Sequence, residues 1–125
     1  MKKLKSLYHG TCRAFLAYAL ENKGLLGPED GETSFTPDLD HAIGYAEQWS
    51  NKRYEKSIEN YFEKDVDTHL KEPVILEIAL KDLQFRYRDD GGKREYYLSH
   101  ALNLNYVKQI YFKEGIDELK KKYNL

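Results

Sequence analysis

The spacing of hydrophobic positions along the chain predicts a mixture of short strands and short helices. Alternating or continuous hydrophobic residues indicate strands, whereas hydrophobic residues that recur every three or four positions indicate helices. The predicted strands cover residues 4–9, 33–36, 73–80, 82–88, 95–98 and 106–112. The predicted helices cover residues 13–22 and 41–49, followed by a charged, nearly helical stretch over 51–71 and a short polar helix after Gly115. The strand at 73–80 has a strongly hydrophobic face, which predicts a central place in its sheet.

Turn-forming and capping residues mark the ends of several of these elements. Asp40 stands where it would cap the N-terminus of the helix at 41–49. Glycine, proline and acidic residues predict a loop over 27–32. The Asp-Asp-Gly-Gly sequence at 89–92 predicts a tight turn, so the strand that begins at Glu95 should form a hairpin with the preceding strand.

Length and composition predict one soluble domain that spans residues 1–125. Hydrophobic residues make up 41% of the chain and charged residues 33%, which is enough hydrophobic surface for one core. Twenty basic and 21 acidic residues leave a net charge of −1, so no overall field attracts nucleic acid or an anionic membrane. Cys12 is the only cysteine, which excludes an intramolecular disulfide and a zinc site built on several thiolates. No hydrophobic run is long enough for a signal peptide or a membrane span, and we expect a cytoplasmic protein without a metal.

Three segments carry side chains that are suited to binding a nucleotide. The first contains His9, Gly10 and Thr11, placed at the end of a predicted strand, where they could contact a planar carboxamide and a ribose. In the second segment, hydroxyl-bearing residues surround Phe35 and an aromatic residue follows in the next helix. The third begins with Glu95 and continues Tyr-Tyr-Leu. Each segment taken alone is more simply explained as packing or as solvated surface.

Taken together and in this order, the three segments resemble the catalytic motifs of the ADP-ribosyltransferase superfamily. The resemblance is to the branch of diphtheria toxin and the poly(ADP-ribose) polymerases, which carries a His-Tyr-Glu set of residues. It implies an α+β fold whose core is a split pair of small, mostly antiparallel sheets flanked by helices. It also implies that NAD⁺ binds as a substrate in the cleft between the sheets, with His9 and Glu95 on adjacent strands and no metal.

The resemblance also implies a role for each matching residue. His9 would bond to a ribose hydroxyl, and the Gly10 backbone, beside Thr11, would hold the nicotinamide carboxamide. Tyr45 matches the second aromatic ring that packs on nicotinamide. Ser34 occupies the position where the first stacking tyrosine is expected, although a shift of one residue would place Phe35 there. Glu95 would accept a hydrogen bond from the ribose 2′-hydroxyl, which tightens as positive charge develops on the ribose, and could orient the nucleophile.

Several functions remain compatible with these residues. The leading one is transfer of ADP-ribose from NAD⁺ to a protein or nucleic-acid acceptor, with release of nicotinamide. NAD⁺ hydrolysis by a toxin-like enzyme is a variant of the same chemistry. RNA 2′-phosphotransferases share the His-Gly-Thr segment and the run into Ala42, but the basic domain and the several arginines of that family are not evident here. A non-catalytic module that binds NAD⁺ or ADP-ribose is a further alternative, and 11 tyrosines would also suit a simple interaction surface.

Overall fold

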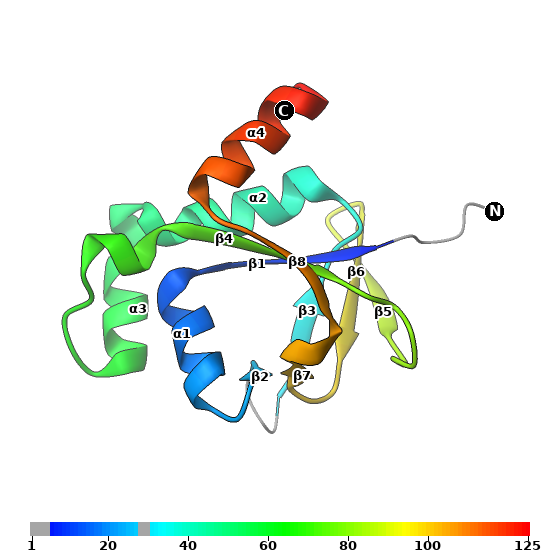
Figure 1. The fold of residues 1–125 in the computed structure, drawn as a ribbon, viewed down its shortest axis with the longest axis horizontal. Coiled ribbons are helices and arrows are strands. Elements are labelled where there is room, and N and C mark those ends of the chain that lie inside the picture. Colours follow the sequence, from blue (N-terminus) through cyan, green and yellow to red (C-terminus); the bar gives the residue numbers. More distant parts are fainter. Residues whose placement is uncertain (1–5, 28–30) are drawn as a thin grey trace.

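The structure is a computed structural model that describes residues 6–27 and 31–125, and these residues form an α+β fold (Figure 1). Residues 4–5 of the first predicted strand and 28–30 of the predicted loop lie outside the described residues. The strands are β1 (Leu7–Cys12), β2 (Leu25–Leu26), β3 (Thr33–Phe35), β4 (Pro73–Ile78), β5 (Arg86–Asp90), β6 (Lys93–Leu98), β7 (Leu102–Asn103) and β8 (Val107–Tyr111). The α-helices are α1 (Arg13–Glu21), α2 (Leu39–Glu47), α3 (Glu55–Phe62) and α4 (Lys113–Tyr123). Short 3₁₀ helices cover Gln48–Ser50, Lys52–Tyr54, Thr68–Lys71 and Leu104–Tyr106.

The strands form three small antiparallel sheets, of which two meet at a single bridge. The larger sheets have the strand orders β1-β4-β8 and β3-β6-β5, and β2 pairs with β7. Tyr8 in β1 exchanges two backbone hydrogen bonds with Thr36, just after β3, at 2.8 and 2.9 Å. This bridge holds the two larger sheets together beside the candidate site. The central position predicted for β4 is confirmed.

Hydrophobic side chains bury both faces of the central strand β4, whereas the edge strand β8 is largely exposed. On one face, β4 packs with α1, β3 and β6 through residues that include Leu16, Phe35 and Leu98. On the other face, α2 and α4 lie over the sheet (Figure 1), and their side chains pack around Ile75. A third cluster joins α1 to α3 around the fully buried Ile58. Among the described residues, no helix is long and hydrophobic enough to cross a membrane.

Local sequence signals located several elements correctly. Helix α1 begins at the predicted residue, and β3 covers most of its predicted range. The hairpin of β5 and β6 turns at Gly91 and Gly92, which have φ angles of +57° and +86°. Positive φ angles at both central residues are what a type I′ hairpin turn requires, and glycine adopts them without strain.

Three other predictions of element ends were wrong, and a contact that is distant in sequence explains the first of them. β1 does not stop at Gly10 but continues to Cys12, since β4 pairs with it along its whole length. His9 is therefore inside a strand, not at its end. Asp38, not Asp40, caps α2 by accepting a hydrogen bond from the His41 N–H at 3.3 Å. Gly115 lies within α4 rather than before it.

Candidate functional site

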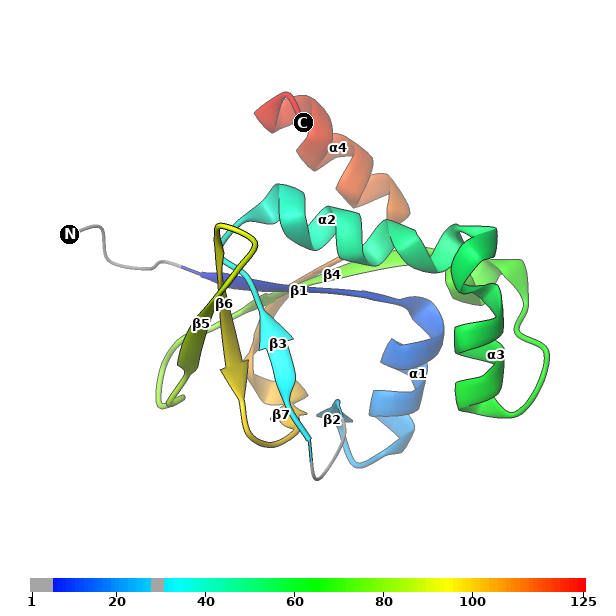
Figure 2. The same ribbon diagram turned by 180° about the vertical axis from the view of Figure 1, so that it is seen from behind.

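One cavity of about 400 Å³ brings together all seven residues that the sequence singled out. A cavity of this size falls in the usual range for small-molecule sites. Residues of β1, β3 and α1 line part of the cavity. In Figure 2, β3 and α1 lie below β1. The seven residues come from β1, β3, α2 and β6; they are His9, Gly10, Thr11, Ser34, Phe35, Tyr45 and Glu95.

His9 is held in a defined tautomer by the backbone of β3. Its Nδ1 atom lies 2.7 Å from the carbonyl oxygen of Ser34, and because a carbonyl only accepts hydrogen bonds, Nδ1 carries the proton. Burial lowers the pKa of His9 below its ordinary value, and the hydrogen bond to Ser34 offsets only part of this effect. The ring is therefore neutral near pH 7, and Nε2 is an acceptor for a donor such as a hydroxyl group.

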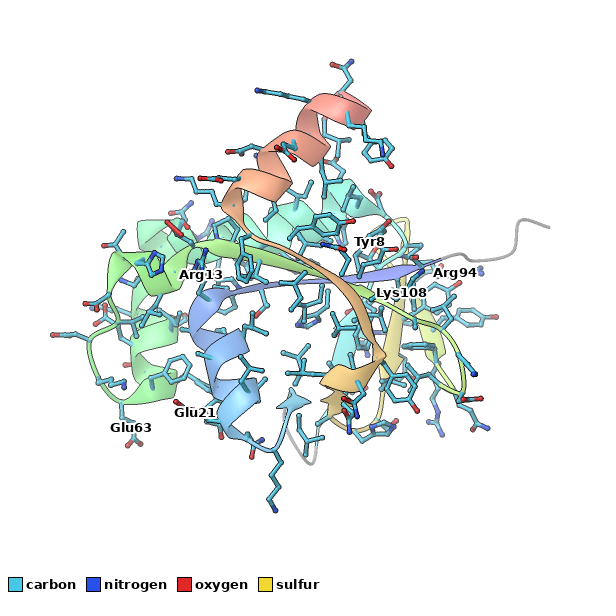
Figure 3. All side chains as sticks on the ribbon, viewed as in Figure 1. Tyr8, Arg13, Glu21, Glu63, Arg94 and Lys108 are labelled. Carbon is cyan, nitrogen blue, oxygen red and sulfur yellow. The ribbon has the colours of Figure 1, made fainter. Side chains whose placement is uncertain are left out.

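Alternation along β1 places different residues on the two sides of this strand. Leu7 packs in the core on the side of the sheet that faces α1 and β3. Because alternate residues of a strand face the same side, the side chains of His9 and Thr11 also face this side, where they line the cavity. Tyr8 lies on the opposite side, packed between the sheet and helices α2 and α4 (Figure 3). The same strand thus supplies side chains to the cavity and to the hydrophobic core.

Gly10 meets two separate requirements. A Cβ atom at this position would lie 2.1 Å from the carbonyl oxygen of Ala42, so α2 can cross β1 this closely only over glycine. The peptide groups of residues two apart in a strand face the same edge. The Gly10 peptide therefore faces the edge at which Tyr8 bonds to Thr36, and this edge borders the cavity.

Phe35 and Tyr45 differ sharply in exposure although both line the cavity. Phe35 is 2% exposed and packs against the rings of His9 and Phe85, with centroid distances of 5.6 and 5.4 Å. It is a core residue whose edge borders the cavity. Tyr45 is 40% exposed and lies next to His41, with 4.8 Å between their ring centroids. Tyr45 is thus the better placed of the two to stack on a flat ligand.

Glu95 lies within β6 and is held by an arginine of the neighbouring strand. Arg88 stands opposite it in β5, and its Nε atom lies 3.2 Å from Oε2 of Glu95. The same guanidinium contacts Glu32 at 2.9 Å, and the Glu95 side chain is only 15% exposed. Glu95 is therefore a fixed carboxylate. The expectation that His9 and Glu95 occupy adjacent strands is wrong, because β3 pairs with β6 and lies between β6 and β1.

The structure also places residues in the cavity that the sequence did not indicate. His41 lines it from the first turn of α2, and its spacing of four from Tyr45 was the one available signal. Four aromatic residues, joined by ring contacts, line the other end: Phe15, Tyr18, Trp49 and Tyr61. Their periodicity suggested only helix packing, since nothing local reveals that α1 and α3 meet.

Comparisons with known proteins support the fold alone. No protein-family model matches the sequence, and no curated protein sequence is similar to it. The crystal structure of protein CC0527 from Caulobacter crescentus is similar, with a TM-score of 0.54 and 16% sequence identity. The match covers 86% of this chain and 84% of that chain, and a double mutant of CC0527 gives the same values.

Proposed function

We propose that this protein is an ADP-ribosyltransferase that binds NAD⁺ in the cavity and transfers ADP-ribose to a macromolecular acceptor. One observation carries the proposal. Seven residues were selected from three separate sequence segments by their resemblance to the His-Tyr-Glu motifs, and all seven line one cavity. An accidental resemblance would not require segments so distant in sequence to meet.

The proposed binding mode assigns the nicotinamide half of NAD⁺ to β1 and α2. His9 accepts a hydrogen bond from a ribose hydroxyl at Nε2, because Nδ1 is already bonded to Ser34. The peptide group of Gly10 bonds to the carboxamide, and the exposed ring of Tyr45 covers one face of nicotinamide. Ser34 leaves the other face without an aromatic wall, so Tyr45 supplies the main stacking contact.

Glu95 carries the chemical step in this proposal. The bond between nicotinamide and the ribose breaks, nicotinamide leaves with the bonding electrons, and positive charge develops on the ribose. A carboxylate that accepts a hydrogen bond from the 2′-hydroxyl stabilises this charge more strongly in the transition state than in the substrate. The nucleophile of the acceptor then bonds to the ribose carbon and loses its proton. The pairing with Arg88 keeps Glu95 in one orientation beforehand.

The lining of the cavity disfavours one alternative. An RNA 2′-phosphotransferase must bind a phosphate, for which arginine and lysine are the usual ligands. Among the described residues, those that line the cavity include neither arginine nor lysine. The phosphotransferase would have to bind this phosphate in addition to the diphosphate of NAD⁺, whereas transfer of ADP-ribose, or NAD⁺ hydrolysis when water is the acceptor, needs no such second phosphate site.

Incubation of the protein with labelled NAD⁺ and cell extract tests the proposal. We expect labelled acceptor and free nicotinamide, and Glu95→Gln should lower the rate by about 100-fold or more, as removal of a transition-state hydrogen bond commonly does. Glu21→Gln is a matched control, because Glu21 is an exposed glutamate on α1 and does not line the cavity (Figure 3). Full activity of Glu95→Gln would refute the role of Glu95, and absence of both nicotinamide release and transfer would refute the function.

A further inference from the structure

The cavity has a second group of rings at the end formed by α1, α3 and the 3₁₀ helix between α2 and α3. This aromatic end consists of Phe15, Tyr18, Trp49 and Tyr61. Phe15 is the central member, with 5.0 Å between its ring centroid and that of Trp49 and 5.0 Å to that of Tyr61. The proposed roles of His9, Tyr45 and Glu95 do not use these rings.

The rings of the aromatic end do not cover one another. Phe15 meets Trp49 at 60° and Tyr61 at 62°, and Tyr18 meets Tyr61 at 82°. In such edge-to-face contacts, the flat faces are not stacked against each other. Tyr18 is 42% exposed and Tyr61 is 55% exposed, whereas the neighbouring Ile58 and Ala14 are buried. Aromatic surface that could have been buried is thus open to solvent at the rim of the cavity.

Gln48 adds a polar group to this end of the cavity. It lines the cavity directly before Trp49, and its amide offers both a donor and an acceptor. A glutamine amide can bond to adenine in a bidentate manner, through the ring nitrogen and the amino group of the base. Because the described lining residues include no lysine or arginine, this end suits an uncharged heteroaromatic ring rather than a phosphate.

We propose that the aromatic end is a binding subsite for a nucleobase, with Tyr61 stacking on the face of the base, Tyr18 contacting it edge to face and Gln48 bonding to its edge. The inference rests on the proposed function, since it gives a second ring-binding site to a cavity that we assign to NAD⁺. The base could come from the adenine half of NAD⁺ or from a nucleic-acid acceptor. These two sources share one chemistry, and the experiment below distinguishes them.

Fluorescence titration with AMP tests the subsite directly. Trp49 is the only tryptophan of the chain, so its emission reports on this end of the cavity. We expect AMP to change the Trp49 emission with a saturable dependence on concentration. Nicotinamide mononucleotide, which lacks a purine, should bind without competing with AMP. If AMP neither alters the emission nor binds by calorimetry at millimolar concentration, the proposal is wrong.

Two substitutions of one residue provide a matched comparison. Tyr61→Ala should weaken AMP binding by about tenfold, because the stacking of a base on an aromatic ring commonly contributes about 5- to 150-fold in affinity. Tyr61→Phe keeps the ring and should bind AMP within about twofold of the wild type. Tyr61 is more than half exposed, so both variants should fold, which circular dichroism verifies. Equal AMP affinity in the alanine variant and the wild type would overturn the proposal.

A further pair of titrations identifies the source of the base. If Tyr61→Ala weakens NAD⁺ binding as much as AMP binding, the subsite holds the adenine of the dinucleotide. If NAD⁺ binding is unchanged while binding of a single-stranded oligoadenylate falls, the subsite holds a base of the acceptor. AMP contains no nicotinamide and undergoes no transfer, so its binding can be established even if the proposed transferase activity fails. Intact transfer without any AMP binding would overturn the subsite alone.

Discussion

Replacement of Gly10 by alanine tests whether the close crossing of α2 over β1 is required. The new Cβ atom would lie 2.1 Å from the Ala42 carbonyl oxygen and 3.0 Å from the Ala46 amide nitrogen. Both neighbouring atoms belong to the α2 backbone, so no side-chain rotation can relieve the overlap. The helix must move away from the strand by roughly 1 Å, and a gap of that size forfeits up to about half of each dispersion contact across it.

Two opposing contributions set the size of the effect. Overpacking a close interface costs about 1–3 kcal/mol. Alanine has fewer conformations than glycine in the unfolded chain, and this difference stabilises the folded state by only about 0.4–1 kcal/mol. We therefore expect Gly10→Ala to lower the free energy of unfolding by about 1–2 kcal/mol, which corresponds to a fall in Tm of roughly 4–8 °C for a chain of this length.

Thermal unfolding followed by circular dichroism measures the effect, with Gly44→Ala as the control. Gly44 is exposed within α2, and a Cβ atom there would meet nothing within 4 Å. Alanine at this helical position should raise stability by about 0.5–1 kcal/mol. The two substitutions are chemically identical and predicted to act in opposite directions. A Tm of Gly10→Ala at or above that of the wild type would refute the packing argument.

Two further predictions concern His9 and Phe35. Because the folded pKa of His9 is lowered, the unfolded chain binds more protons just below the ordinary value of 6.5, so stability should fall as the pH falls through this value. Urea unfolding between about pH 5 and pH 8 measures this slope, and His9→Gln should flatten it; an unchanged slope would contradict the assignment. Phe35→Ala should lower the free energy of unfolding by about 3–5 kcal/mol, because the ring is buried in the core. A loss below about 1 kcal/mol in urea unfolding would show that Phe35 is not a core residue.

The sequence predicted the parts of the fold that depend on local signals. The glycines at the β5–β6 turn and the hydrophobic spacing of α1 act within a few residues, so their structural consequences can be recognised without the rest of the chain. The extension of β1 through Gly10 could not be predicted in this way. It depends on pairing with β4, more than 60 residues later in the chain.

In the candidate site too, some features could be predicted from the sequence and others depend on tertiary contacts. Motif order identified seven of the residues that line the cavity, because their types follow from the chemistry that the resemblance implies. The hydrogen-bond partner of His9 is the backbone carbonyl of Ser34, and a backbone group cannot be predicted from the type of residue that carries it. The fixed orientation of Glu95 depends on its register with Arg88, and the aromatic end requires α1 and α3 to meet. These features depend on tertiary contacts that a residue pattern does not specify.

The pairing of β1 with β4 has a consequence for the time at which the site forms during synthesis. Leu7 pairs with Ile78, and Phe35 pairs with Tyr96, so each strand that supplies cavity residues must wait for a partner made much later. Contacts of such long range are slow to form, because the intervening chain must first lose its freedom. His9 leaves the ribosome early but has no defined surroundings until β4 and β6 have emerged. A cavity built in this way is incomplete in the nascent chain and can bind a ligand only once most of the sequence has been translated.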